Sequence, residues 1–98
     1  MRFYFAHKKL ERLYTQEKGA HKYPEGVVDG FSDVISSIDA AKDERDTCAL
    51  KDLRYEKLGG KRSHQGSLGL NDQFRLIVER EEDEEGKFFW IIDVEDYH

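Results

Sequence analysis

Apolar side chains follow two different spacings along the chain, one in each half of the sequence. In residues 7–41 they recur every three or four positions, which is typical of helices with one buried face. The spacing predicts a first helix from His7 to about Gln16 and a second helix with Pro24 in its first turn. The polar run Asp43–Asp46 is expected to close the second helix. The apolar face of that helix comprises Val27, Val28, Phe31, Val34, Ile35, Ile38 and Ala41.

Strands are predicted at the start of the chain and throughout its second half, where apolar and polar residues alternate. The segment Gln73–Glu79 alternates cleanly, with Arg75 on the polar side. The segment Phe88–Val94 is apolar for most of its length and is expected to be an interior strand buried on both faces. Helices followed by strands favour an α+β fold, with both helices packed on a mostly antiparallel sheet of four or five strands. The predicted strands are Arg2–Phe5, Leu53–Leu58, Ser67–Leu70, Gln73–Glu79 and Phe88–Val94, and Glu81–Gly86 is the predicted hairpin loop.

Length and composition indicate one domain formed by residues 1–98. Although 38% of the residues are charged, the 12% that are aromatic argue against a disordered chain. Cys48 is the only cysteine, so an intramolecular disulfide is impossible and the sequence fits a reducing cytoplasm. The first residues lack the apolar core of a signal peptide, and no apolar run approaches the roughly 20 residues that span a bilayer. We therefore expect a soluble cytoplasmic protein without a membrane partner.

The net charge of −5 argues at first against nucleic-acid binding, but the charges are unevenly distributed. Ten acidic residues follow Ser63, and half of them fall in the run Glu81–Glu85. The segment Arg54–Arg62 is locally basic, with two arginines and two lysines. A basic face can therefore coexist with an acidic total.

Two sequence blocks carry a specific resemblance to a known family. The block Leu53–Ile77 reads LRYEKLGGKRSHQGSLGLNDQFRLI, which combines a basic turn, a strand, an N-D-Q turn and an aromatic-Arg-aliphatic strand. The second block is the ending Val94–His98, which closes on Asp-Tyr-His. Both blocks, with the order strand, helix, helix and strands, resemble HigB-type (plasmid maintenance killer) toxins of the RelE/ParE superfamily.

The resemblance implies a toxin of a type II toxin–antitoxin system. HigB-like toxins bind the ribosome and cut mRNA in the decoding site with the RNA's own 2′-hydroxyl as nucleophile, and no metal or other cofactor is expected. The implied protein partner is a helix-turn-helix antitoxin, and operator DNA would be reached only through the complex with that antitoxin.

The resemblance also implies the site residues. Cleavage through the 2′-hydroxyl needs a base, an acid and cations that offset charge on the phosphorane. His98 suits either proton role because its unperturbed pKa lies near 6.5, and Asp96 could orient the site or act as the base. Tyr97 could stack on a nucleobase or donate a hydrogen bond, and Arg75 is the expected phosphate clamp. The expected RNA contacts are Lys57, Lys61, Arg62 and His64.

Two alternative functions remain, one from positions that depart from the HigB pattern and one from the ParE branch of the superfamily. Gly66 and Gly69 fall in the strand where HigB-like sequences carry basic or bulky residues, and glycine supplies no charge and weakens a strand. An attenuated or inactive relative that only binds its antitoxin and co-represses its operon is one alternative. The other is a non-enzymatic gyrase inhibitor of the ParE branch, which generally lacks the Asp-Tyr-His ending.

Overall fold

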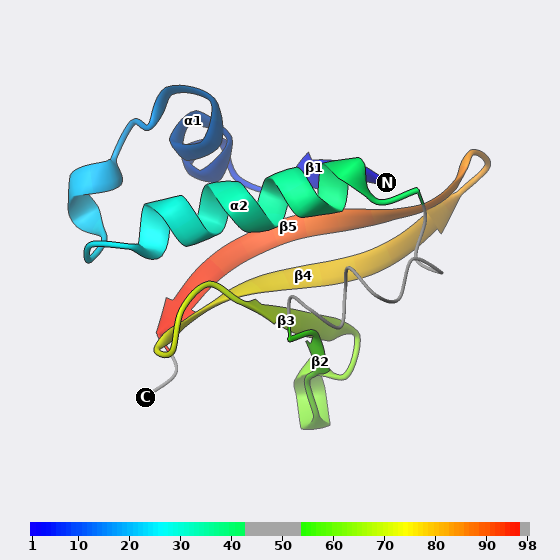
Figure 1. Ribbon diagram of the computed structural model, residues 1–98. Coiled ribbons are helices and arrows are strands. Elements are labelled where there is room, and N and C mark those ends of the chain that lie inside the picture. Colours follow the sequence, from blue (N-terminus) through cyan, green and yellow to red (C-terminus); the bar gives the residue numbers. More distant parts are fainter. Residues whose placement is uncertain (43–53, 97–98) are drawn as a thin grey trace.

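Two helices lie on one face of a five-stranded sheet, and the first strand of the chain joins an edge of that sheet (Figure 1). The computed structural model describes residues 1–42 and 54–96. The helices are α1 (Lys8–Gln16) and α2 (Val27–Ala40), with short 3-10 turns η1 (Ala20–Lys22) and η2 (Gly60–Arg62). The strands are β1 (Arg2–Phe5), β2 (Glu56–Lys57), β3 (Gln65–Gly69), β4 (Phe74–Asp83) and β5 (Gly86–Asp96).

The sheet order is β1-β5-β4-β3-β2, which places the long β4–β5 hairpin at its centre. Only β1 runs parallel to its neighbour, β5, and every other pair is antiparallel. The expected α+β class, with an N-terminal strand and two helices on a mostly antiparallel sheet, is therefore confirmed.

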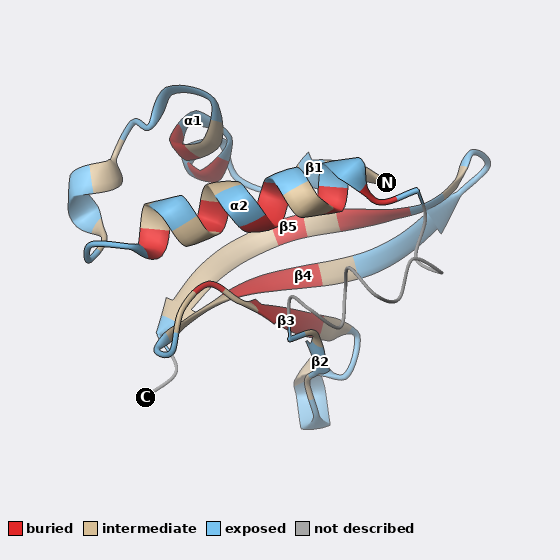
Figure 2. Cartoon of the chain, viewed as in Figure 1, coloured by how far each residue is buried: buried red, intermediate tan, exposed pale blue. Residues whose placement is uncertain are grey.

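The core lies between the helices and the sheet face that they cover, as the buried positions in Figure 2 show. Leu10 and Leu13 of α1 are buried, as is most of the predicted apolar stripe of α2, in which Val28 is only half-buried; the predicted Ala41 is buried just after the helix ends. From the sheet, rows of residues that oppose one another across the strands supply the other side. These rows include Leu68–Leu76–Val94 and Gly66–Val78–Ile91 across β3, β4 and β5.

The second helix begins later than the sequence predicts. Pro24 lies outside α2, and the helix starts at Val27 after Gly26, whose φ of 88° is left-handed. The Val27 amide donates to the Pro24 carbonyl over 3.2 Å, so the proline takes part in a turn that precedes the helix. Glycine reverses the chain here at little steric cost, and a proline-first helix was the wrong choice of start. The proposed closing run Asp43–Asp46 lies outside the described residues.

The hairpin between β4 and β5 is tighter than predicted. Strand pairing continues to Asp83 and Gly86, so only two residues turn the chain where a six-residue loop was expected. Arg2 reaches across from β1 and donates to both Asp83 carboxylate oxygens, at 2.7 and 3.0 Å, and to the Gly86 carbonyl at 2.9 Å. These bonds support an acidic strand end that the sequence suggested would be a solvated loop.

Two strand predictions need smaller corrections. Of the predicted strand Leu53–Leu58, only Glu56 and Lys57 pair with β3, and Leu53 lies outside the described residues. The interior position of β5 is confirmed, but it is buried on both faces only around Phe88 and Phe89, because the residues after Ile91 are only half-buried.

Candidate functional site

The candidate site lies on the open face, by which we mean the sheet face opposite α1 and α2. Strand register places Gly69, Arg75 and Glu95 in one row across β3, β4 and β5, and Ser67, Ile77 and Asp93 in the next. Because side chains in one row share a face, these residues point away from the core rows. The segment that follows β2, coloured light green in Figure 1, lies at the β2 edge of the sheet, and its Arg62 reaches Glu95 of this face.

Arg75 is held in place by three acceptors. Its Nε donates to the Ser67 hydroxyl over 2.7 Å, and its Nη2 donates to the Ser67 carbonyl over 3.2 Å and also to the Arg54 carbonyl. Ser67 is fully buried and is the one polar residue in the buried set of the described chain. Two of the three guanidinium nitrogens are therefore fixed by the protein, which sets the orientation of the group before any ligand binds.

Arg62 crosses the open face from η2 to β5. Its two terminal nitrogens donate to the two Glu95 oxygens over 3.1 and 2.8 Å, and its Nε donates to the Gln65 side chain over 3.1 Å. Since β4 lies between β3 and β5, the side chain spans β4 beside the row that contains Arg75. Both ion-pair partners keep more than a third of their side-chain surface exposed, at 41% and 34%, so the pair organises the face without being sealed from water.

The remaining predicted RNA contacts are less closely associated. His64 Nε2 lies 3.4 Å from Glu79, which also accepts from Gln65 over 2.8 Å. Lys57 and Lys61 are exposed, and Lys57 opposes Gly66 in a core-side row, so it does not share the Arg75 face. The structure thus brings Arg62 to Arg75 and leaves the two lysines at the periphery.

Asp96 closes β5 near Arg75 but on the other face of the sheet. It opposes Phe74, a residue packed against the core, whereas Glu95 opposes Arg75. The Gln73 side chain donates to Asp96 over 3.1 Å, and the carboxylate is exposed. The two do not share a face, so the expected grouping of Asp96 with Arg75 is not formed by the strand itself. Tyr97 and His98 lie outside the described residues.

Sequence reasoning missed Arg54, Ser67 and Glu95. Arg54 has a left-handed φ of 57°, and its Nη2 donates to the Asn71 carbonyl over 2.9 Å. Its guanidinium rests on Gly69, where an added Cβ would lie 2.6 Å from Nε and 2.7 Å from Cζ. The local basic run was the only signal for Arg54, and no local pattern indicates which serine or glutamate would meet which arginine.

The two strand glycines that suggested a weakened strand have a steric role. A Cβ at Gly66 would collide with the Tyr55 ring, just as one at Gly69 would collide with the Arg54 guanidinium. Strand β3 nevertheless pairs with both of its neighbours over these positions. The Tyr55 ring in turn lies 4.6 Å from the Arg80 guanidinium, a cation–π distance. The glycines therefore make room for side chains from the segment before β2.

A second concentration of positive charge lies between α1 and η1. A cavity of about 180 Å³ is lined by four cationic side chains and one tyrosine. Lys9 is 3.6 Å from Asp93, and the other three cations have no ion pair within residues 1–42 and 54–96. The lining residues are Lys9, Arg12, Lys18, Gly19, Lys22 and Tyr23.

Resolved pKa shifts fall far from both basic regions. The hydrogen bonds from Arg2 lower the pKa of the Asp83 carboxyl below its usual value, and the same contact raises the pKa of the Arg2 guanidinium. Within the described part of the chain, no three His, Cys, Asp or Glu side chains are grouped as metal ligands. None of the described helices is long and apolar enough to cross a membrane.

The fold and the arginine-rich open face define a small RelE/ParE-like toxin, and the comparisons with known proteins agree. The family described as "RelE-like toxin of type II toxin-antitoxin system HigB" matches residues 3–94, and the chain belongs to it. A solved structure titled "YoeB/ParE toxin from Agrobacterium tumefaciens" is similar in fold, with a TM-score of 0.58, 13% identity and 100% of both chains covered. No curated protein matches the chain. The family match confirms the expected resemblance and implies an antitoxin partner, although it stops short of the ending Glu95–His98.

Proposed function

We propose that this type II toxin is a ribosome-dependent endoribonuclease that cuts mRNA through the RNA 2′-hydroxyl without a metal ion. The observation that carries the proposal is the fixed Arg75 guanidinium on the open face, where Arg62 and Arg54 supply two further guanidinium groups. A guanidinium oriented in advance can stabilise charge on a phosphorane without reorganising during the reaction. The helix-turn-helix type of the antitoxin partner belongs to the same proposal.

Arg62 and Arg75 would bind different phosphates of the RNA backbone. Arg75 has one terminal nitrogen, Nη1, without a partner among residues 1–42 and 54–96, and that nitrogen can donate to a phosphate oxygen. Arg62 already neutralises Glu95, and an incoming phosphate would compete with that carboxylate. We assign Arg75 to the scissile phosphate, and Arg62, Lys61 and His64 to the flanking backbone.

Proton transfer would come from the end of the chain. We assign His98 as acid or base, because its unperturbed pKa near 6.5 suits both roles, and Tyr97 to stacking or hydrogen bonding with a nucleobase. Asp96 lies on the helix side of β5, where its carboxylate accepts from Gln73, and from there it would orient His98.

The cavity between α1 and η1 would contact ribosomal RNA. Its Lys18, Lys22 and Arg12 are cations on one concave surface, and Lys9 at the same cavity lies 3.6 Å from Asp93 of the open face. Phosphate contacts of this kind position a protein on nucleic acid without reading its sequence. Two separate basic surfaces allow one to hold the ribosome while the other meets the message.

The nuclease assignment is tested by primer extension on mRNA after induction of the toxin without its antitoxin. We expect cuts with wild type, none with His98→Ala, and a loss of about 100-fold with Arg75→Gln, the scale of removing one oxyanion donor. Arg80→Gln is the matched control, because Arg80 lies on the same strand but stacks on Tyr55 on the core side. Its cutting should stay near wild type.

Other outcomes separate the alternatives. A growth defect with DNA damage and no mRNA cuts would favour gyrase inhibition. Wild-type protein that is folded but causes neither cuts nor a growth defect would favour the inactive co-repressor. Unchanged cutting in His98→Ala would remove His98 from the mechanism.

The ribosomal contact is tested by cosedimentation with ribosomes. The double substitution Lys18→Glu and Lys22→Glu should weaken binding about tenfold or more, and the loss should shrink as salt rises, because the attraction is electrostatic. Lys8→Glu with Lys42→Glu changes the net charge equally at exposed lysines outside the cavity. If both double variants lose binding equally, the cavity has no specific role and net charge alone explains the effect.

A further inference from the structure

Arg54 lies beside Arg75 on the open face. Gly69 and Arg75 are paired in register across β3 and β4, so a side chain at position 69 would stand next to that of Arg75. The Arg54 guanidinium fills that space, since an added Cβ at Gly69 would lie 2.6 Å from its Nε and 2.7 Å from its Cζ. A residue from before β2 thus supplies a cation to the β3 position that carries no side chain.

Two hydrogen bonds and one backbone conformation describe how Arg54 is held there. Its carbonyl accepts from Arg75 Nη2, its Nη2 donates to the Asn71 carbonyl over 2.9 Å, and its backbone adopts a left-handed φ of 57°. An arginine in this conformation is uncommon, and the surrounding bonds must hold it. Arg54 therefore positions Arg75 through its backbone and stands beside it through its side chain.

Two neighbouring guanidinium groups carry positive charge that no carboxylate between them neutralises. The nearest acid in this row, Glu95, accepts both terminal nitrogens of Arg62. Among residues 1–42 and 54–96, no carboxylate forms an ion pair with Arg54 or Arg75. Like charges on neighbouring side chains repel, and an anion that bridges them removes the repulsion.

We propose that Arg54 and Arg75 form a two-guanidinium site for one phosphodiester of single-stranded RNA, with Arg54 seated in the space left by Gly69. The inference rests on the proposed nuclease function and names a further phosphate-binding residue for it. Planar guanidinium groups donate to phosphate oxygens through paired N–H groups, which an ammonium group cannot do. The site therefore requires arginine, and not merely a positive charge, at position 54.

Three variants separate this site from a merely structural role of Arg54. Arg54→Gln should lower mRNA cutting by about tenfold to 100-fold and reduce the slope of log binding constant against log salt by about 0.7 for a single-stranded RNA oligonucleotide. Arg54→Lys should keep most of the salt slope but recover only part of the cutting. Gly69→Arg alone should lose cutting, because its side chain has no room beside Arg54.

Relocation of the charge gives the decisive comparison. In the double variant Arg54→Ala with Gly69→Arg, the space is vacated and the guanidinium returns on β3, so cutting should recover at least tenfold over Arg54→Ala. Melting temperature and binding to the antitoxin are measured for every variant, so that only folded proteins are compared. Equal cutting and equal salt slope for wild type and Arg54→Gln would overturn the proposal, as would failure of the folded double variant to recover.

Titration with inorganic phosphate distinguishes failure of this site from failure of the nuclease assignment. In the wild-type protein, NMR signals of the Arg54 and Arg75 Nε–H groups should shift together with one binding constant, and Arg54→Gln should abolish the Arg75 shift. If phosphate binds in this way but no RNA is cut, the nuclease assignment fails and the site stands. If RNA is cut and only Arg75 responds to phosphate, the two-guanidinium site is wrong and the nuclease assignment stands.

Discussion

Gly30 of α2 lies against the backbone of Leu70, and Gly30→Ala tests that close approach directly. A Cβ at this position would lie 3.1 Å from the Leu70 carbonyl carbon and 3.3 Å from its Cα, and nearer still to the carbonyl oxygen. All three atoms belong to backbone, which cannot rotate away as a flexible side chain would. One methyl group must therefore displace either the helix or the strand end.

The expected size of the effect follows from two opposing contributions. At an exposed helix position, glycine to alanine gains about 1 kcal/mol from helix propensity. Overpacking a well-filled contact costs about 1–3 kcal/mol, occasionally more, and an obstructed backbone carbonyl belongs at the upper end of that range. We expect Gly30→Ala to lower the free energy of unfolding by about 2 kcal/mol, or roughly 10 °C in melting temperature for a chain of this size.

Urea and thermal unfolding measure this change, with Ser36→Ala as the control. Ser36 is exposed on the same helix, so its replacement by alanine should raise the free energy of unfolding by about 0.5 kcal/mol. The displaced Leu70 adjoins Asn71, whose carbonyl holds Arg54, so RNA binding should weaken as well. A Gly30→Ala protein that is as stable as Ser36→Ala would refute the close approach of α2 to Leu70.

Three further outcomes concern the open face and the hairpin. Ser67→Ala should cost about 1–3 kcal/mol and lower cutting, because Arg75 Nε loses its buried acceptor; unfolding and primer extension that match wild type would contradict this. Arg2 lowers the pKa of Asp83 from its ordinary 3.8, so the stability it confers is present above that pH and is lost as pH falls through the folded value. Asp83→Asn should thus be less stable than wild type at pH 7 and lose that deficit below pH 3.8 in thermal melts; a deficit that is constant with pH would exclude the ion pair. Gly86→Ala should cost about 1–3 kcal/mol because φ is 111°, and unchanged urea unfolding would show that the turn tolerates a side chain.

The local spacing of apolar residues was sufficient to predict the helices and strands that bury one face. The α1 boundaries, the α2 stripe and the Arg2–Phe5 strand follow from spacing within a few residues, and the structure confirms them. One error lies where a distant residue contributes, and the other where a local turn does. The β4–β5 pairing continues to Asp83, where Arg2, 81 residues away, donates to the carboxylate. The start of α2 depends on the left-handed turn at Gly26, for which Pro24 gave a competing signal.

The candidate site was predictable only in part, for the same reason. The sequence motif identified Arg75, but its orientation depends on a serine eight residues before it and a carbonyl 21 residues before it. The pairing of Arg62 with Glu95 joins positions 33 residues apart, and only strand register reveals it. Gly69 was interpreted as a missing charge, whereas in three dimensions it is the space that Arg54 occupies. A strand position without a side chain can therefore still carry a cation, provided that another segment is folded over it.

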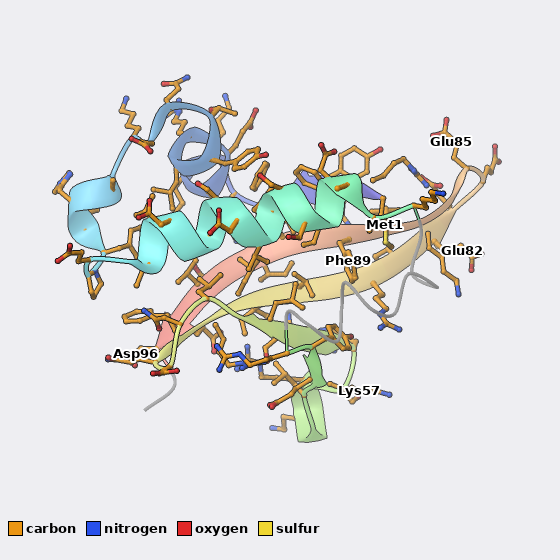
Figure 3. All side chains as sticks on the ribbon, viewed as in Figure 1. Met1, Lys57, Glu82, Glu85, Phe89 and Asp96 are labelled. Carbon is orange, nitrogen blue, oxygen red and sulfur yellow. The ribbon has the colours of Figure 1, made fainter. Side chains whose placement is uncertain are left out.

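The same geometry answers the objection that a chain of net charge −5 should not bind RNA. Glu82 and Glu85 lie at the hairpin tip, whereas Asp96 ends β5 at the opposite end of the sheet (Figure 3). From Gly86 to Glu95 the strand extends about 30 Å, almost four Debye lengths at physiological ionic strength. RNA at the open face would therefore be largely screened from the acidic run. Three acids of this face have partners of their own: Glu95 pairs with Arg62, Asp93 lies 3.6 Å from Lys9, and Glu79 accepts from Gln65. The field around Arg75 therefore depends on this local arrangement and not on the total charge.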